Sequence, residues 1–264
     1  MKLKKRIAKY PFFRRILTKF YIEDISYPGH FLTKDKIGPI IIPHEGDVIA
    51  SCFKKYGSWQ GGISQLIIDL CTPSSKILEI GSNYGLHARE IAHYCNEIHC
   101  IEANPSIAPY LQMNLVMCGA GNTNMYNICA SNKSGEVIFL DRSNTSNSGY
   151  SRIIQEGDDL SEGKQIKLSS KPLDQIFQDI DFDIIKIDIE GHELEALQGA
   201  KETLSKVQFV IIETNHLEQL QVNVLEDFNF FKIELLPEHL ENGYILHPID
   251  APLRTSEFLA VRKK

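Results

Sequence analysis

Short apolar runs alternate with segments of helical periodicity over most of the chain. In the runs, apolar residues alternate or follow one another without proline, which is typical of buried strands. These runs lie at 76–80, 98–102, 125–130, 136–140, 182–189 and 207–212. Apolar residues recur at helical spacing at 58–71, 88–95, 107–118 and 190–204. Strands and helices in this order predict an α/β fold with a doubly wound, mostly parallel sheet.

The two ends of the chain depart from this pattern. Strands are predicted near 230–236, 243–246 and 257–262, one of them antiparallel at an edge of the sheet. Residues 23–55 are punctuated by Pro and Gly, which predicts short strands or a hairpin covering one end of the core. We therefore divide the chain into an N-terminal basic helical segment and capping extension, 1–56, and a main domain, 57–264.

Two segments within the main domain are less regular. The stretch 141–149 is rich in Ser, Asn and Asp and has no core of its own. It is either a lid over a substrate or a plain surface connection. A short helix is predicted to begin within 169–174, where Pro172 precedes an apolar stripe.

Charge is distributed unevenly along the chain, whose formal net charge is −6. Residues 1–20 hold eight Lys or Arg and no Asp or Glu, so the remainder carries 20 basic and 34 acidic residues. An acidic body does not favour nucleic acid, because phosphate contacts need clustered cations. The basic arm, interleaved with Phe, Leu and Ile, either contacts an anionic membrane surface peripherally or packs on the domain as a helix with a solvated basic face.

Composition restricts the location and the chemistry. No run of about 18 apolar residues exists, and the N-terminus lacks the apolar block of a signal peptide, so we expect a cytoplasmic protein, either free or peripheral to the inner face of the membrane. The six cysteines form no CxxC pair and are expected to be reduced and structural, with no zinc site.

The turn that follows the strand at 76–80 carries the first chemical signal. Two glycines, Gly81 and Gly85, would let the backbone approach a ligand at the start of a helix. The spacing G-x-G-x-x-G of dinucleotide enzymes is absent, because Asn83 and Leu86 occupy the second and third positions. Two acidic residues, Glu79 and Glu102, flank the turn and would repel a pyrophosphate. A cationic nucleoside with free ribose hydroxyls, such as S-adenosylmethionine, suits this arrangement better.

Four motifs in order resemble the FkbM family of S-adenosylmethionine-dependent methyltransferases. The segment 186–200, KIDIEGHELEALQGA, is similar to the family's K-I-D-x-E-G-x-E-x-x-x-L-x-G-A, and EIGSNYG at 79–85 resembles its D-x-G-A-N-I-G turn. The segment 102–105, EANP, departs from the family's E-P-N-P at Ala103, and NSG at 147–149 resembles a family loop. The resemblance covers about 57–215 and implies a class I, Rossmann-like methyltransferase fold for the domain 57–264.

The resemblance also implies a donor site. Gly81, Asn83 and Gly85 are expected to hold the methionine part through their backbone while Glu79 orders the turn. Glu102 is expected to accept both ribose hydroxyls, and the Ala130–Ser131 turn to lie beside the adenine. The complete set of predicted cofactor-binding residues is Glu79, Gly81, Ser82, Asn83, Tyr84, Gly85, Glu102, Asn104, Ala130 and Ser131.

The predicted catalytic residues are Asp188, Glu190 and His192, which emerge together at the end of the strand at 182–189. Asp188 would contact the donor or acceptor, and Glu190 or His192 would act as the base for a hydroxyl acceptor. Alternatively, Glu190 is simply an acidic residue at a helix start and His192 a surface residue. An Mg²⁺ site formed by Asp188, Glu213 and Asn215 is a further alternative that the resemblance does not require.

The function that the resemblance implies is methylation of a hydroxyl on a sugar, glycan, glycolipid or secondary metabolite. The shared motifs do not specify the acceptor, and the sequence predicts no oligomeric state. Two other classes remain as alternatives: an NAD(P)-dependent Rossmann oxidoreductase, which the glycine spacing disfavours, and a non-catalytic S-adenosylmethionine-binding protein.

Overall fold

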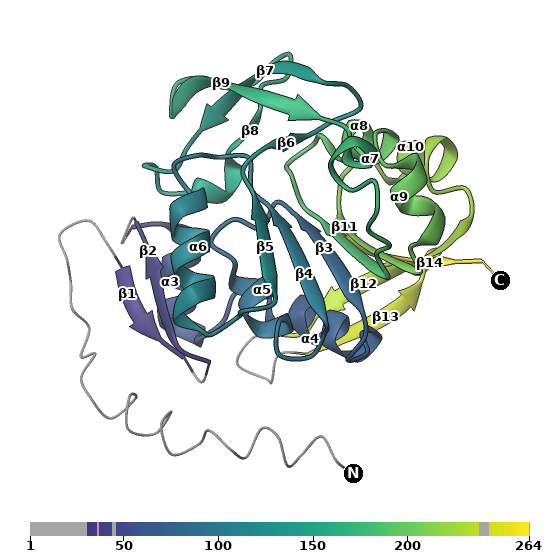
Figure 1. Cartoon of the computed structure of the whole chain (residues 1–264), viewed down its shortest axis with the longest axis horizontal. Coiled ribbons are helices and arrows are strands. Elements are labelled where there is room, and N and C mark those ends of the chain that lie inside the picture. Colours follow the sequence, from purple (N-terminus) through teal and green to yellow (C-terminus); the bar gives the residue numbers. More distant parts are fainter. Residues whose placement is uncertain (1–30, 36, 44–45, 238–242, 264) are drawn as a thin grey trace, which may run out of the picture.

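A twisted eight-stranded sheet forms the centre of the molecule (Figure 1). The computed structural model describes residues 31–35, 37–43, 46–237 and 243–263. The strand order is β13-β12-β14-β11-β10-β3-β4-β5. The five strands from β11 to β5 run parallel, and β14, β12 and β13 extend the sheet antiparallel. The bounds are β3 Lys76–Ile80, β4 Glu97–Ile101, β5 Thr123–Tyr126, β10 Ile184–Ile187, β11 Phe209–Glu213, β12 Phe228–Leu235, β13 Tyr244–Pro248 and β14 Glu257–Arg262.

Helices cover both faces of this sheet, as the sequence predicts for a doubly wound fold. Successive residues of a strand point to opposite faces, so Ile77 packs with α4, α5 and α6 while Leu78 packs with α7 to α10. The first group comprises α4 Gly61–Leu70, α5 Leu86–Ile91 and α6 Ala108–Met117. The second comprises α7 Leu173–Ile176, α8 Glu193–Gln198, α9 Lys201–Lys206 and α10 Leu217–Asn223.

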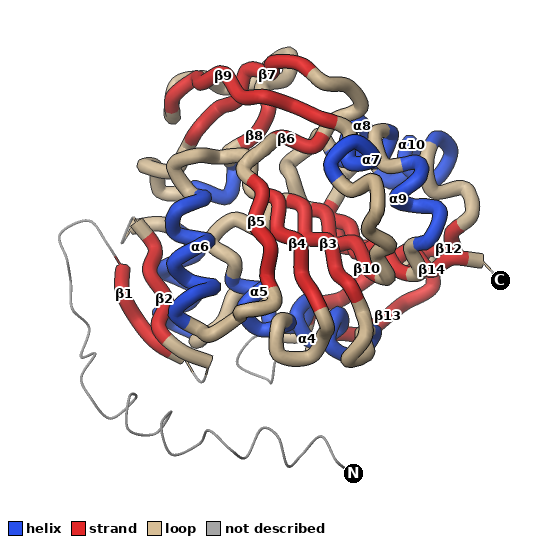
Figure 2. Tube along the Cα trace, in the orientation of Figure 1, coloured by secondary structure: helices blue, strands red, loops and turns tan. Residues whose placement is uncertain are grey.

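A second, four-stranded sheet lies above the carboxyl ends of the parallel strands (Figure 2). Its order is β6-β9-β7-β8, with bounds β6 Cys129–Ala130, β9 Lys164–Lys171, β7 Gly135–Asp141 and β8 Arg152–Ile153. The predicted strand 125–130 is therefore wrong as a single element, because the chain leaves one sheet after β5 and enters the other at β6. Strand β9 was not predicted, whereas the helix expected to begin within 169–174 is present and starts at Leu173.

An N-terminal hairpin and helix pack against the main domain. The hairpin predicted within 23–55 is present as β1 Phe31–Lys34 and β2 Pro39–Ile42, whereas α3 Val48–Tyr56 was not predicted. A buried bidentate ion pair, Arg89 to Asp35, ties the hairpin to α5. Ile40, Ile42, Ile49 and Phe53 share an apolar cluster with Tyr84, Leu86 and Ile107 of the main domain. Residues 31–56 are thus continuous with the core, while the basic segment 1–22 lies outside the described residues.

Two further differences from the expected elements have local causes. The predicted helix 190–204 is two helices, α8 and α9, that meet at Gly199, where a Cβ would overlap the Ser131 carbonyl oxygen. The C-terminal region supplies three antiparallel strands rather than one, because β14 inserts between β11 and β12. Over the residues that the structure describes, no helix is long and apolar enough to cross a membrane.

Candidate active site

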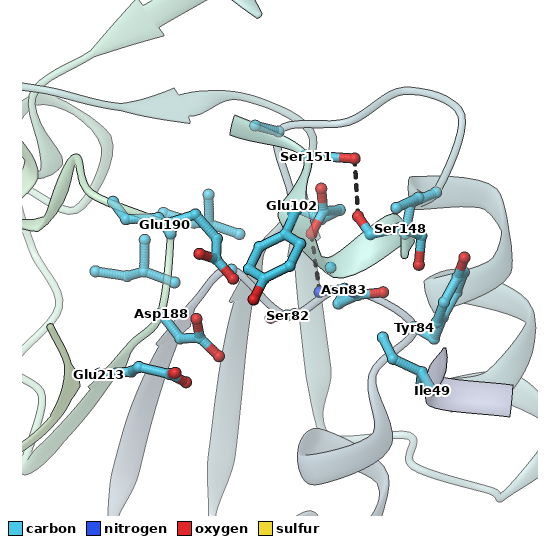
Figure 3. Close-up of a pocket in the computed structure, with 18 of the residues that line it drawn as sticks. Ile49, Ser82, Asn83, Tyr84, Glu102, Ser148, Ser151, Asp188, Glu190 and Glu213 are labelled. Atoms are coloured by element: carbon cyan, nitrogen blue, oxygen red, sulfur yellow. Dashed lines mark hydrogen bonds between the residues drawn. The ribbon is translucent and has the colours of Figure 1, made fainter. Parts of the chain in front are cut away.

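A cavity of about 390 Å³ opens at the carboxyl ends of β3, β4 and β10, beneath the second sheet. Figure 3 shows Asp188, Glu190 and Glu213 together on one side, Tyr84 and Ile49 on the other, and Glu102 between them. Of the predicted site residues, nine line the cavity: Gly81, Ser82, Asn83, Tyr84, Glu102, Ala130, Asp188, Glu190 and His192. Glu79, Gly85, Asn104 and Ser131 lie immediately behind these and do not line it, and neither does Asn215.

The turn after β3 brings bare backbone to the cavity. Gly81 has a φ of +84°, and a Cβ there would overlap the carbonyl oxygen of Asp188. The N–H groups of Gly81 and Ser82 both donate to the Ile101 carbonyl oxygen at 2.9 Å, which binds the turn to the end of β4. Asn83 follows with a φ of 49°, and Gly85 begins α5 with a φ of 75°. These positions require glycine or a strained residue, so the turn is built for close approach.

Glu102 is fixed by backbone donors on both sides. One carboxylate oxygen accepts the N–H of Asn104 at 2.7 Å, and the other accepts the N–H of Asn83 at 2.8 Å. Burial raises the pKa of Glu102 to about 7, although both backbone hydrogen bonds oppose the shift. Each carboxylate oxygen has a second lone pair, so the group can still accept hydroxyl donors from the cavity.

Asn104 acts one layer behind Glu102. Its side-chain Nδ2 donates to Asp141 at 2.7 Å, and its side-chain Oδ1 accepts the N–H of Ser106 at 2.9 Å. This side chain is fully buried. It therefore holds the loop after β4 against the end of β7 and keeps the Glu102 backbone in place.

Buried charges continue beneath the turn. Glu79 and Lys186 are neighbours in register across β3 and β10, and Lys186 donates to Asp188 at 3.0 Å. Neither carboxylate oxygen of Glu79 has a hydrogen-bond partner among the described residues. Burial raises the pKa of Glu79 to about 7, and the Lys186 charge opposes that shift. For Lys186 the two carboxylates outweigh burial and raise its pKa, so it remains charged.

One end of the cavity is acidic. Asp188, Glu190 and Glu213 line it, and Glu257 lies behind Glu213 as its register partner on β14. Burial raises the pKa of Glu190 to about 8, and the charges of Asp188 and Glu213 add to the shift. Burial also raises the pKa of Glu213, again assisted by Asp188.

His192 has a polar neighbour at each ring nitrogen. Its Nε2 lies 3.0 Å from the Ser131 hydroxyl, and its Nδ1 lies 3.5 Å from a Glu195 carboxylate oxygen. Burial lowers the pKa of His192, with Glu195 opposing, so the ring favours its neutral form. These contacts connect the loop after β6 to the start of α8.

Several lining residues were not predicted. Ile49 lines the cavity from α3, Trp59 and Gln60 from the turn between α3 and α4, and His87 from α5. The signal for α3 was present in the sequence, because Asp47 caps its N-terminus and Gly57 ends it in a left-handed conformation. The cavity-facing direction of these side chains depends on the tertiary fold.

The loop 141–149 contributes to the cavity through Asn147, Ser148 and Gly149. The Asp47 carboxylate connects it to α3, because it accepts the N–H of Ile49 at 2.7 Å and the N–H of Ser148 at 2.9 Å. The loop is therefore a wall of the cavity rather than a plain surface connection.

Backbone strain is concentrated at this cavity. Among the described residues, three that are not glycine have a positive φ: Gln60, Asn83 and Glu190. All three line the cavity. Left-handed backbone at such residues costs free energy and tends to persist where function requires it, which supports assigning the site here.

The lining fits an adenosine-type donor better than a metal. Within the part of the chain that the structure describes, no group of three or more His, Cys, Asp or Glu is arranged to hold a metal ion. By contrast, the buried Asn83 Oδ1 and His87 Nε2 lack partners, and both residues line the cavity. Unpartnered buried polar atoms beside a cavity point to a ligand that supplies the missing hydrogen bonds.

A parallel sheet with a glycine turn after β3 and a buried carboxylate after β4 is the arrangement of class I, Rossmann-like methyltransferases. The sequence comparison agrees, because the methyltransferase FkbM domain matches residues 79–246. The match covers more than half of the chain. The chain therefore belongs to the FkbM methyltransferase family.

Individual proteins show more distant similarity. The hexuronic acid methyltransferase AglP of Haloferax volcanii is 27% identical over 160 residues, which span 57% of this chain and 60% of that protein. A methyltransferase FkbM from Methylobacillus flagellatus KT is 18% identical with a TM-score of 0.49, covering 72% of this chain and 44% of that one. TYW2 of M. jannaschii, solved with AdoMet, is 10% identical with a TM-score of 0.47, covering 90% and 89%.

Replacing Gly81 by alanine tests the close approach at the turn. A left-handed alanine costs about 1–2 kcal/mol, and the overlap with the Asp188 carbonyl adds a cost of similar size. Gly119→Ala is the matched control, because Gly119 also has a positive φ, +75°, but has open space around its Cβ position. Urea unfolding should therefore show a clearly larger loss for Gly81→Ala. Equal losses would mean that strain alone, and not close packing, requires glycine at residue 81.

Proposed function

We propose that this protein transfers the methyl group of S-adenosylmethionine to a hydroxyl oxygen of a sugar, glycan, glycolipid or related metabolite. The observation that carries the proposal is the FkbM domain match over a cavity lined by the glycine turn and the Glu102 carboxylate. A hydroxyl acceptor is supported by the carboxylates at one end, which can accept hydrogen bonds from a polyol. The curated relative acts, by its name, on a hexuronic acid.

In the proposed donor site, Glu102 accepts the two ribose hydroxyls on the lone pairs that Asn83 and Asn104 leave unused. The apolar residues Ile128, Ala130 and Phe139 surround the adenine. Gly81 and Ser82 face the methionine part. Glu79, which does not reach the cavity, lies beneath the turn beside Lys186, and its charge helps to raise the pKa of Lys186.

S-adenosylmethionine supplies an electrophilic methyl group on a sulfonium. The acceptor oxygen forms a bond to the methyl carbon as the sulfur–carbon bond breaks, and the hydroxyl proton leaves to a base. The chain's main contribution is to align the two groups and exclude water, because in-line displacement is sensitive to geometry. The walls from α3 and the loop 147–149 enclose this space.

Glu190 is the residue we assign as the base. It lines the cavity next to Asp188, and its raised pKa places it near the operating pH, where general bases are most effective. His192 is the weaker candidate, because its Nε2 is hydrogen-bonded with Ser131 and its Nδ1 faces the Glu195 carboxylate at 3.5 Å. Asp188, held by Lys186, is positioned to contact the donor or the acceptor.

Membrane contact and cytoplasmic location stay predictions from the sequence. Peripheral contact of residues 1–20 with the inner face of the membrane concerns residues outside the described ranges. A cytoplasmic location is likewise a prediction from the sequence. Mg²⁺ is not part of the proposal, because Asp188 already pairs with Lys186 and Asn215 does not line the cavity.

The function is tested by incubating the full-length protein with methyl-labelled S-adenosylmethionine and a panel of sugar nucleotides, glycosides and glycolipids. Label should appear as a methyl ether in at least one acceptor, detected by mass spectrometry, and EDTA should leave the incorporation unchanged. Glu102→Ala protein serves as the blank. Donor binding without transfer to any hydroxyl compound would favour a non-catalytic binding protein, and sensitivity to EDTA would restore the metal hypothesis.

A further inference from the structure

The cavity has two chemically different ends, and this difference orients the donor. On the β5 side its walls are apolar, formed by Ile128, Cys129 and Phe139. On the β10 and β11 side they are charged, formed by Lys186, Asp188 and Glu213. Glu102, at the end of β4, lies between these ends. If Glu102 holds the ribose, as the proposed function requires, the amino-acid part of the donor extends toward β10 and β11.

The charged end at β10 and β11 suits the α-ammonium group of an amino acid better than its α-carboxylate. An α-ammonium group finds acceptors in Asp188 and Glu213, but an α-carboxylate meets like charge. It therefore needs N–H donors from groups that line the same end. Lys186 is one, although its ammonium already donates to Asp188 at 3.0 Å.

His87 is a second candidate donor, because it lines the cavity near enough to Lys186 for that charge to lower its pKa. It follows the glycine turn on α5, is 6% exposed and lines the cavity. Its Nδ1 lies 2.9 Å from the hydroxyl of Ser64 on α4, and its buried Nε2 has no partner in the described structure. Burial, together with the Lys186 charge, holds the pKa of His87 well below its usual value, so the ring is neutral and carries one N–H.

We propose that His87, fixed by Ser64, donates its Nε2–H to the α-carboxylate of S-adenosylmethionine. When Nδ1 accepts a hydrogen bond from the Ser64 hydroxyl, the proton of the neutral ring is at Nε2. His87 is then a positioning residue: it anchors the amino-acid tail and so fixes the direction in which the sulfonium methyl points. The ring carries no charge of its own, so it can meet the carboxylate without competing with Lys186 for Asp188.

The test compares two ligands that differ only in the carboxylate: S-adenosylhomocysteine and its decarboxylated analogue. Calorimetry on the full-length protein gives the affinity ratio of the two. A hydrogen bond to a charged group corresponds to about 10- to 100-fold in affinity, so His87→Asn should weaken S-adenosylhomocysteine by that factor. The affinity of the analogue should stay nearly constant, which a purely structural role of His87 would not produce.

Three further variants make the result specific. His87→Gln keeps a side-chain N–H of similar reach. This variant should retain part of the preference for S-adenosylhomocysteine over its decarboxylated analogue. Ser64→Ala removes the hydroxyl that fixes which ring nitrogen of His87 carries the proton. It should lower the preference for S-adenosylhomocysteine as His87→Asn does, but by a smaller factor. His99→Asn is the matched control: His99 is equally buried but packs against Tyr126, Phe177 and Phe182 outside the cavity, so this variant should leave the ratio unchanged.

Each outcome decides the proposal. A selective loss for the carboxylate ligand in His87→Asn supports it. An equal loss for both ligands, or no loss, overturns it while leaving the methyltransferase assignment intact. A wild-type protein that binds neither ligand would overturn the proposed donor site itself, and with it this inference.

Discussion

Glu102→Ala should abolish measurable binding of S-adenosylhomocysteine. The substitution removes the acceptor for two ribose hydroxyls, and each hydrogen bond to a charged group contributes about 1.5–3 kcal/mol. The expected loss is about 10²- to 10⁴-fold in affinity. It also orphans the N–H groups of Asn83 and Asn104, which now donate to this carboxylate, so the turn itself should loosen. Isothermal titration calorimetry measures the effect directly.

Two comparisons make this result interpretable. Glu102→Gln keeps an acceptor oxygen for one backbone N–H, so it should retain the fold and lose most, but not all, of the affinity. Glu136→Gln, on the exposed surface of β7, should bind as the wild type does. Wild-type affinity in Glu102→Ala would show that the ribose lies elsewhere and would remove the basis of the donor site.

Glu190→Gln should lower the rate of methyl transfer by about 10²- to 10⁴-fold while leaving donor binding nearly unchanged. In the wild type, burial and the neighbouring carboxylates place the pKa of Glu190 at about 8. A base must be deprotonated to act, so the rate should rise as the pH increases through about 8 and then level off. The variant should lack this rising limb. Rates under saturating donor, with the acceptor identified by the labelling screen, provide the measurement.

The same experiment distinguishes the two candidate bases. His192→Asn should preserve the limb near pH 8, because the ring is held by Ser131 and Glu195 and does not need to accept the proton. If this variant instead removes the limb, the base is His192. A carbon-13 NMR titration of the Glu side chains gives an independent check, since one signal titrating near pH 8 should vanish in Glu190→Gln.

The sequence predicts the centre of this protein well, because the signals there are local. The strand 76–80 carries Ile77, Leu78 and Ile80 without proline, and the glycines of the following turn are needed by its backbone geometry. Glu102 could be placed because it ends the next parallel strand, and the carboxyl ends of parallel strands meet at one edge.

The periphery was less predictable for physical reasons. Strand β9 is mostly exposed, and only Ile166 and Leu168 alternate with polar residues along it, so the strand pattern is short. The segment 125–130 has enough apolar residues for one strand, but the Asn127–Ile128 link transfers the chain between two sheets. Gln60 and His87 are also invisible to sequence patterns as site residues, because their direction depends on how α4 and α5 pack against the sheet.

The link between Asp47 and Ser148 has a consequence for how the protein acquires its activity. The two residues are 101 positions apart, so the outer wall of the cavity exists only after distant parts of the chain have met. Closing such long loops is entropically costly and slows folding. Donor affinity should therefore be among the last properties to appear during refolding. Once present, the bound donor should shift the equilibrium toward the fully assembled chain.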